Sequence, residues 1–295
     1  MSDYDMPLYR PPSEAHSLIF QITLGCSFNQ CSFCSMYRTK SFTVRPMEEV
    51  LAEVREAARY DSGARRVFLA DGDALVCPTE YLEEVLGTLY ESFPRLTRVT
   101  SYALPANLLR KSVEELTRLR QRGLTMIYYG IESGSPEILK RITKGATPES
   151  MVIGIDKARA AGLKVSGTVV LGLGGRMLWR EHMDGTIALV NQVALNYLST
   201  LQVYLMPIVR EEFSEKFARR GGTYEPQDDL GILAEQARLV AGITPPSPVI
   251  FRANHASNAL PLKGILPRDR ARILSLLGAA SNGEIPLRPL SRRGL

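Results

Sequence analysis

The segment CSFNQCSFC at residues 26–34 contains three of the chain's four cysteines. It follows a β-branched and aromatic run, Ser17–Leu24, that is typical of a strand ending in a loop. Three such close cysteines in a chain of 295 residues indicate a metal site, because disulfide frameworks are typical of small secreted chains. Three thiolates from one loop can bind three irons of a [4Fe–4S] cubane and leave the fourth iron open to a small ligand. The predicted metal ligands are Cys26, Cys31 and Cys34.

Outward from this segment, short β-branched or aromatic runs alternate with stretches of helical periodicity. Gly123 and Gly162 follow two of the helical stretches and directly precede strands, as C-terminal helix caps do. This alternation predicts βαβ units and a parallel sheet. The predicted strands are Ser17–Leu24, Arg66–Ala70, Leu96–Tyr102, Leu124–Ile131, Leu163–Leu171 and Ser199–Leu205. The predicted helices are Met47–Tyr60, Thr79–Glu91, Ser112–Arg122, Pro148–Ala161 and Glu181–Gln192.

The number of strand–helix units restricts which α/β fold the chain can form. About six units precede Met206, fewer than the eight of a complete barrel, so a partial (β/α)6 TIM-like barrel or a doubly wound sheet fits. Both place ligands at the carboxyl ends of the strands, where the cysteine segment begins. The alternation then stops, and two helices near Asp228–Ala241 and Arg268–Ala279 predict a short helical C-terminal extension. The expected domains are an N-terminal extension (1–16), the barrel (17–225) and a C-terminal helical cap with a basic tail (226–295).

Composition excludes several classes of protein. With 45% hydrophobic and 23% charged residues, the chain is an ordinary globular protein, and it has no long apolar run that could span a membrane. Its first residues lack the basic and apolar stretches of a secretory signal, which predicts a cytoplasmic location. The net charge is +5, and the residues from Lys263 onward carry all of this excess. A basic tail can bind nucleic acid, but a solvated surface is the favoured interpretation.

Four further segments at strand ends, together with the cysteines, resemble the radical S-adenosylmethionine (SAM) superfamily over about residues 17–225. The family pattern is C-x3-C-x2-C, and this chain has C-x4-C-x2-C with the family's aromatic residue at Phe33. The similar branch contains oxygen-independent coproporphyrinogen oxidase, methylthiotransferases and the elongator acetyltransferase subunit. The segments are LADGDALVCPTEYL (69–82), YYGIESGSPEILKRITKG (128–145), VVLGLGG (169–175) and LQVYLMPIVREEF (201–213), the last without the branch's Gly-Thr-Pro.

The resemblance implies a chemistry and its cofactors. A [4Fe–4S] cluster, reduced by an electron donor such as flavodoxin or ferredoxin, would pass one electron to SAM and cleave it to methionine and a 5′-deoxyadenosyl radical, which abstracts hydrogen from the substrate. The α-amino group of SAM needs an acceptor, which the turn Asp71-Gly72-Asp73 offers. The ribose diol needs a bidentate acceptor, for which Glu132 with Ser133 is the candidate. The expected adenine contacts are Phe33, Leu171, Gly172 and Met206.

The sequence indicates the substrate-binding residues less directly than it indicates the cofactor-binding residues. Tyr102 and Tyr128 are candidates to line a substrate cavity, although strand tyrosines are often half-buried sheet residues. The segment FRANHASN (251–258) is a hydrogen-bonding stretch between apolar runs and predicts either a cap over the substrate or a structural turn. We expect Cys77 to be a core residue and His182 a surface helix residue. The candidate substrate contacts in this stretch are Arg252, Asn254, His255 and Asn258.

Several functions compete at this point. A small molecule is the favoured substrate, because the chain shows neither a preceding cobalamin domain nor a second cysteine-rich region. The branch resemblance and the basic tail support RNA or tRNA modification as the alternative, and a haem-handling relative of coproporphyrinogen oxidase is a further one. A zinc-stabilised, non-catalytic binding module is the alternative from another class, because His16 precedes the three cysteines.

Overall fold

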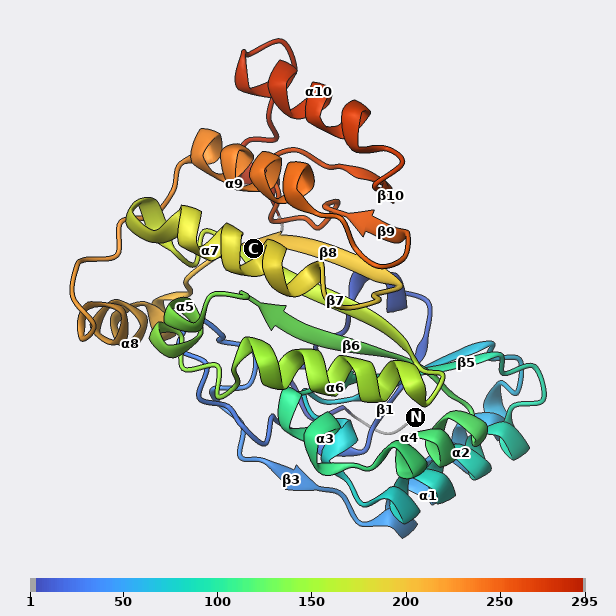
Figure 1. Cartoon of the computed structure of the whole chain (residues 1–295). Helices are drawn as coiled ribbons and strands as arrows, with labels where there is room; N and C mark the ends of the chain where they lie inside the picture. Colours follow the sequence, from blue (N-terminus) through green and yellow to red (C-terminus); the bar gives the residue numbers. More distant parts are fainter. Residues whose placement is uncertain (1–3, 294–295) are drawn as a thin grey trace. The chain divides into compact units, whose positions relative to one another are not determined.

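The computed structural model, drawn in Figure 1, describes residues 4–293. These residues divide into two compact units. The first unit comprises residues 4–29, 36–129 and 156–165, and the second comprises residues 30–35, 130–155 and 166–293. The cysteine segment is divided between them, with Cys26 in the first unit and Cys31 and Cys34 in the second. Each unit is therefore described by itself.

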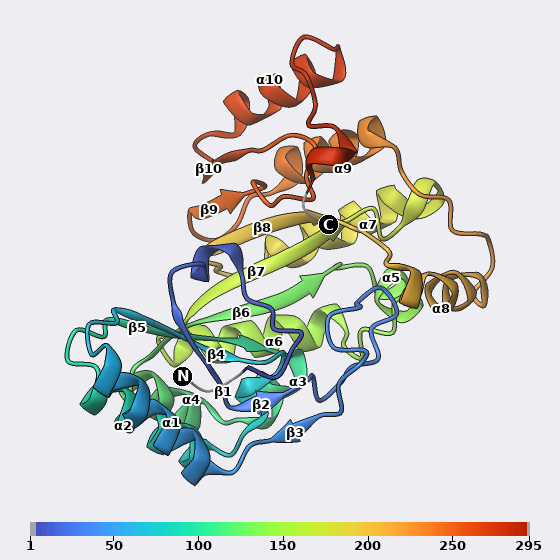
Figure 2. The same ribbon diagram turned by 180° about the vertical axis from the view of Figure 1, so that it is seen from behind.

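The first unit is built on parallel strands. Leu18 pairs with Val67 and Val99 pairs with Leu124, and the strand residues 67–70 are all buried. Such continuous apolar runs are typical of parallel strands that are covered on both faces. The strands are β1 (Leu18–Gln21), β4 (Arg66–Ala70), β5 (Arg98–Ala103) and the first residues of β6 (Leu124–Glu132). The short antiparallel pair β2 (Thr23–Leu24) and β3 (Thr43–Val44) bounds the loop that holds Cys26 (Figure 2).

Four helices belong to the first unit, and α1, α2 and α4 pack side by side (Figure 1). In α1, Val50, Leu51 and Val54 are buried at helical spacing, while the opposite face carries acidic and basic side chains. Ser112 begins α4 with a capping box, in which its hydroxyl accepts from the Glu115 amide. The helices are α1 (Met47–Tyr60), α2 (Thr79–Ser92), α3 (Pro105–Arg110) and α4 (Val113–Gln121). Two 3-10 turns are η1 (Pro12–Glu14) and η2 (Ala74–Val76).

In the second unit, β7 and β8 are parallel, β8 and β9 are parallel, and β10 adds to β9 in the antiparallel direction. Helix α7 packs on α9, and α9 packs on α10. The strands are β7 (Lys164–Leu171, from Ser166 onward), β8 (Tyr197–Gln202), β9 (Val249–Arg252) and β10 (Lys263–Leu266). The helices are α5 (Pro136–Arg141), α6 (Pro148–Ala160, in its first residues), α7 (Gly175–Val190), α8 (Pro207–Ala218), α9 (Asp229–Gly242) and α10 (Arg270–Ser281). The 3-10 turn η3 (Leu290–Arg292) follows.

The predicted α/β class is confirmed, because mostly parallel strands alternate with helices in both units. The sequence pattern did not predict the short helices α3 and α5, helix α8, or strands β3, β9 and β10. These three strands have two to four residues each, too few for an alternating pattern to stand out. Helix α7 begins at Gly175, earlier than the expected Glu181, because its first residues follow a glycine-rich stretch typical of a turn. Within residues 4–293, no helix combines the length and apolarity needed to cross a bilayer.

Candidate functional site

In the first unit, the turn after β4 is hydrogen-bonded to the residues that lead into Cys26. The Gly72 amide donates to the Gly25 carbonyl oxygen at 3.0 Å. A Cβ atom at Gly72 would lie 3.2 Å from the Cys26 Cβ and 2.6 Å from the ring of Tyr37, so that only glycine fits. Gly25 itself has a φ of 73°, in the left-handed region. Glycines at both positions therefore allow the cysteine loop to lie directly against the turn.

The carboxylate of Asp71 is buried and already fully hydrogen-bonded by the protein. Its Oδ1 accepts from Gln21 Nε2 at 2.8 Å, and its Oδ2 accepts from the Gly25 amide and from Lys40 Nζ, both at 2.9 Å. A carboxylate with these partners fixes the start of the cysteine loop. The predicted SAM residue Asp71 thus has a structural role that the sequence did not indicate.

Asp73 differs from Asp71 in its partners. Its Oδ2 accepts a hydrogen bond from Ser27 Oγ, whereas its Oδ1 is buried and has no hydrogen-bond partner within residues 4–293. Burial raises the pKa of Asp73 to about 7, although the side chains of Ser27 and Asn107 and the charge of Arg110 lower it. A buried acceptor without a donor costs free energy, so this oxygen is suited to receive a donor from a ligand.

In the second unit, a buried lysine lies beside two of the cysteines. Lys144 Nζ lies 3.0 Å from Glu132 Oε1. Burial lowers the pKa of Lys144, but the Glu132 carboxylate and the thiolates of Cys31 and Cys34 outweigh it and raise that pKa overall. The Ser32 amide donates to the Ile142 carbonyl oxygen at 2.9 Å and so ties the cysteine segment to the chain just before Lys144.

Lys144 was not predicted from the sequence as a site residue. It follows a run of apolar residues that ends at Ile142, and a lysine in such a position is usually exposed. The backbone makes room for the ion pair, since a Cβ at Gly130 would lie 2.9 Å from Lys144 Nζ and closer still to Glu132 Oε1. Glu132 has a φ of 60°, a conformation that costs free energy in a non-glycine residue and is concentrated at functional sites.

Ser133 and His182 form a buried pair. Ser133 Oγ lies 2.8 Å from His182 Nδ1, and His182 Nε2 lies 2.9 Å from the Val170 carbonyl oxygen. Nε2 next to a carbonyl must carry the proton, so Nδ1 accepts from the serine hydroxyl. Burial lowers the pKa of His182 to about 4 and keeps the ring neutral. The prediction of an exposed His182 was wrong, because it lies on the buried face of α7.

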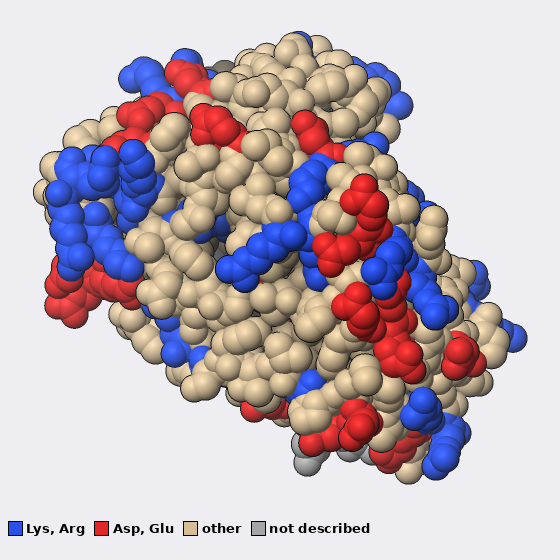
Figure 3. Space-filling model, turned by 60° about the horizontal axis from the view of Figure 1, so that its bottom comes forward, with Lys and Arg blue, Asp and Glu red and all other residues tan. Residues whose placement is uncertain are grey.

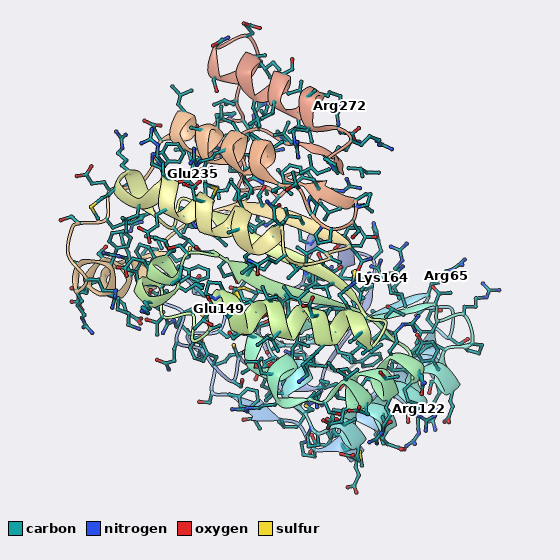
Figure 4. The ribbon with its side chains drawn as sticks, in the orientation of Figure 1. Arg65, Arg122, Glu149, Lys164, Glu235 and Arg272 are labelled. Atoms are coloured by element: carbon teal, nitrogen blue, oxygen red, sulfur yellow. The ribbon has the colours of Figure 1, made fainter. Side chains whose placement is uncertain are left out.

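The turn after β7 is held on both sides by the C-terminal part of the second unit. The Gly172 amide donates to Glu235 Oε2 at 2.7 Å, and Tyr224 OH donates to the Gly172 carbonyl oxygen at 3.0 Å. Glu235 lies on α9 (Figure 4), and burial raises its pKa to about 7. Glu235, which the sequence placed in the C-terminal cap, and Tyr224, at the end of the predicted barrel, thus position a predicted adenine contact. Of the other predicted adenine contacts, Leu171 is buried, Phe33 is partly exposed and Met206 is exposed.

The two candidate substrate tyrosines lie in an aromatic group of the first unit. The ring centroids of Phe68 and Tyr102 are 5.1 Å apart, and those of Tyr102 and Tyr128 are 6.2 Å apart. Tyr128 OH donates to the buried carboxylate of Glu14 and lies 2.7 Å from Ser13 Oγ. Tyr128 therefore contacts residues of the N-terminal extension, and Tyr102 packs on Phe68 and Tyr128.

The candidate residues of 252–258 belong to the second unit and have different environments. Asn258 is buried, and its Nδ2 donates to the carbonyl oxygens of Thr200 at 2.7 Å and Ala253 at 2.9 Å. His255 Nδ1 lies 2.9 Å from Ser257 Oγ, and burial lowers the His255 pKa. Asn254 is exposed, and Arg252 lies on β9. Hydrogen bonds thus fix the fold of this segment.

The three thiols fit an iron–sulfur cluster by their chemistry. Cys26, Cys31 and Cys34 are partly exposed, whereas Cys77 is fully buried. Within the described part of the chain, no three His, Cys, Asp or Glu side chains are grouped around one metal ion. A structural zinc ion requires four ligands on a single centre, whereas a cubane takes one thiolate on each of three irons. Soft thiolates also favour such clusters.

The model of the radical SAM superfamily matches residues 20–189, more than half of the chain. The protein therefore belongs to the radical SAM superfamily, and it is an enzyme. The family works with a [4Fe–4S] cluster and SAM, so these are its cofactors.

Individual relatives share only about a quarter of their aligned residues with this chain. An uncharacterized methyltransferase of Pyrococcus horikoshii is 26% identical over 175 residues, which cover 59% of this chain and 36% of the relative. A tRNA-2-methylthio-N(6)-dimethylallyladenosine synthase of Xanthomonas oryzae pv. oryzae is 27% identical over 254 residues, covering 79% of this chain and 47% of the relative. The chain thus spans less than half the length of the curated relatives it matches.

Solved structures support the predicted fold. Coproporphyrinogen III oxidase of Escherichia coli, a radical SAM enzyme, superposes with a TM-score of 0.58 at 16% identity, covering 76% of this chain and 52% of that one. The radical SAM methyltransferase TsrM of Kitasatospora setae, with cobalamin and a [4Fe–4S] cluster bound, has a TM-score of 0.56 at 17% identity and coverages of 90% and 61%. At these identities the likeness concerns the fold, and it agrees with a partial TIM-like barrel.

Proposed function

We propose that Cys26, Cys31 and Cys34 each bind one iron of the cluster, and that the chain presents SAM to the open fourth iron to begin a hydrogen abstraction. When bound and reduced, the cluster supplies the electron that cleaves SAM to methionine and a 5′-deoxyadenosyl radical. The observation that carries the proposal is the buried cation of Lys144 beside two of the thiols and Glu132. A buried cation among negative groups stabilises thiolates over thiols.

The two carboxylates of the turn after β4 have separate roles in this proposal. Asp73 accepts a hydrogen bond from the α-ammonium group of SAM, because its Oδ1 is the buried oxygen that has no protein donor. Asp71 keeps the Gly25 amide and Lys40 in place and acts as a positioning residue.

Lys144 and Glu132 provide the complementary charges of the second unit. The ammonium group of Lys144 suits the α-carboxylate of SAM, and Glu132 accepts hydrogen bonds from the ribose diol. Ser133 orients the end of β6 through His182 instead of contacting SAM with a free hydroxyl. The turn Leu171–Gly172, with Phe33 and Met206, contributes the apolar surface for adenine.

The substrate itself remains a choice between two classes. The sequence favours a small molecule, whereas the names of relatives that act on tRNA support tRNA as a second candidate. A comparison of two fractions separates these classes. The reduced enzyme with SAM is incubated with either a metabolite extract or bulk tRNA, and each fraction is analysed by mass spectrometry. A product in one fraction that requires both SAM and Cys31 identifies the class.

The proposed chemistry is tested with anaerobically reconstituted protein. SAM and dithionite are added, and 5′-deoxyadenosine is quantified by mass spectrometry for wild type, Cys31→Ala and Cys77→Ala. We expect product from wild type and Cys77→Ala and none from Cys31→Ala. A product yield from Cys31→Ala equal to that of wild type would overturn the proposal.

A further inference from the structure

A groove in the second unit carries an excess of positive charge. It has a volume of about 290 Å³ and lies between β9, β10 and the start of α10. A single acidic residue, Asp269, lines it. Its four basic residues are Arg252, Lys263, Arg268 and Arg272. By contrast, basic and acidic side chains alternate along the right side of the face shown in Figure 3.

Two of these cations face each other without an acid. Lys263 is the direct partner of Arg252 in the antiparallel pair of β9 and β10. Like charges directly opposite each other destabilise a sheet. Asp269 pairs with Arg268 at 3.1 Å and lies 3.8 Å from Arg272. Within residues 4–293, neither Arg252 nor Lys263 forms an ion pair, so their charges are not neutralised by the described protein.

The start of α10 adds to this imbalance. A helix N-terminus carries a partial positive charge and favours acidic side chains, but the first turn of α10 has none and includes Arg272 (Figure 4). The side chain of Asp269 does not cap the helix; its Oδ2 accepts instead from the Ile265 amide at 2.8 Å. Cross-strand cations and a helix N-terminus therefore both favour a negative charge in this groove.

Other basic groups of the C-terminal region are already engaged. The guanidinium of Arg293 is almost fully buried and forms two hydrogen bonds to the Asp229 carboxylate, at 2.7 and 2.6 Å. Arg288 Nη1 donates to the Ala256 carbonyl oxygen at 3.2 Å. These side chains tie the end of the chain to the second unit. In the groove, Arg252 Nη1 donates to the Phe251 carbonyl oxygen at 3.2 Å and Arg272 Nη2 to the Lys263 carbonyl oxygen at 2.8 Å. The groove is thus a place where two basic side chains, Arg252 and Lys263, lie opposite each other without an acidic partner among residues 4–293.

We propose that this groove binds a phosphate group, with Arg252 and Lys263 as its principal ligands. Arginine offers a planar fork of donors that matches phosphate oxygens, lysine adds a point charge, and helix N-termini commonly bind phosphate. The phosphate belongs either to an RNA backbone or to a small phosphorylated molecule. This inference does not depend on the cluster or on SAM.

The test uses the full chain, reconstituted anaerobically, and a double variant, Arg252→Gln with Lys263→Gln. Binding of pyrophosphate is measured by calorimetry, and binding of bulk tRNA by fluorescence anisotropy at two salt concentrations. The matched control, Arg59→Gln with Lys140→Gln, removes the same charge from exposed helix positions of α1 and α5. We expect the groove variant to lose about tenfold or more in affinity, because it removes two charge-assisted contacts, and the control to change less than about twofold.

The two sources of phosphate give different results. If RNA is the ligand, tRNA affinity falls in the groove variant and its dependence on log salt concentration becomes shallower by about two. If a small phosphorylated molecule is the ligand, pyrophosphate binding falls and tRNA binding does not. Failure of wild type to bind either probe, or equal losses in the groove and control variants, would overturn the proposal.

A thermal measurement guards against misfolding of the variant. Removing two opposed cations should leave the melting temperature of the groove variant at or above that of wild type without ligand. Pyrophosphate should raise the melting temperature of wild type and leave that of the variant unchanged. Should the double variant not fold, Lys263→Gln alone is measured in the same way, and an unchanged affinity for both probes would contradict the proposal.

Discussion

The proposed SAM contacts of the two units differ in their surroundings. In the first unit, Asp73 is buried without a neighbouring cation in hydrogen-bonding contact, and one of its oxygens has no donor within residues 4–293. In the second unit, Glu132 is paired with the buried Lys144. The Asp73 oxygen in the first unit thus has no donor from the described protein, whereas the Glu132 carboxylate in the second unit already has a cationic partner. Substitutions in the two units should therefore differ in their effects on SAM binding, bound iron and stability.

The largest effect should be common to both units. Cys26→Ala in the first unit and Cys31→Ala in the second should each abolish the cluster, because each removes the ligand of one iron. We expect iron content and visible absorbance to fall to background in both, and Cys77→Ala to retain them. A stable cluster in Cys26→Ala would show that the second unit alone is sufficient, and a stable cluster in Cys31→Ala would show that Cys31 is not a ligand.

Lys144→Ala should be the most damaging substitution after the cysteines. It leaves the Glu132 carboxylate, whose side chain is 12% exposed, without its partner. Breaking a fully buried ion pair typically costs about 3–5 kcal/mol, which is the upper limit for this partly buried pair. We expect lower stability, less bound iron and weak SAM binding, measured by thermal unfolding, iron analysis and calorimetry. Lys140→Ala on the exposed face of α5 is the control. The double variant Lys144→Ala with Glu132→Gln should recover part of the stability, and no recovery would argue against the ion pair as the cause.

Asp73→Asn should weaken SAM binding and leave the fold unchanged. Loss of a charge-assisted hydrogen bond to the SAM ammonium should weaken SAM binding by about 10- to 100-fold, with iron content unchanged. Asp71→Asn should instead disturb the cysteine loop and reduce bound iron, because Asp71 holds the Gly25 amide and Lys40. If Asp71→Asn reduced SAM affinity at full iron loading and Asp73→Asn did not, the two roles would have to be exchanged.

Glu235→Gln should have the smallest effect on SAM binding and a clear effect on the pH dependence of stability. Burial raises the Glu235 pKa from 4.5 to about 7, so the folded state holds its proton more tightly than the unfolded state. This stabilisation is complete below pH 4.5 and is lost as the pH rises through 7. Relative to the variant, wild type should lose at most about 3 kcal/mol of unfolding free energy between pH 4.5 and 8. If the unfolding free energies of wild type and Glu235→Gln changed with pH in the same way, the raised pKa of Glu235 would be contradicted.

The sequence identified the elements whose signal is local. Predicted strands matched β4 to the residue, and the cysteine spacing indicated the cluster, because each feature depends on neighbouring residues. The distinction between Asp71 and Asp73 was not predictable, because it depends on partners as remote in sequence as Gln21 and Lys40. Lys144 and His182 were missed for the same reason, since long-range packing buries both of them.

The C-terminal region shows the same limit at a larger scale. An apparent helical cap proved to include β9 and β10 and to supply Glu235, which holds the turn at Gly172. A buried carboxylate on a helix has no distinctive pattern in sequence, because exposed glutamates occupy helices far more often. Only the hydrogen bond to the Gly172 amide reveals its role.

The most direct test of the account is whether SAM contacts the cluster. Wild-type protein is reconstituted, reduced and mixed with SAM labelled with magnetic isotopes at the amino nitrogen and the carboxyl carbon. Electron–nuclear double resonance is then recorded on the reduced cluster. We predict couplings to both labels in wild type, weaker occupancy in Asp73→Asn at the same SAM concentration, and no cluster signal in Cys31→Ala. A fully loaded wild-type cluster without coupling to either label would contradict the account.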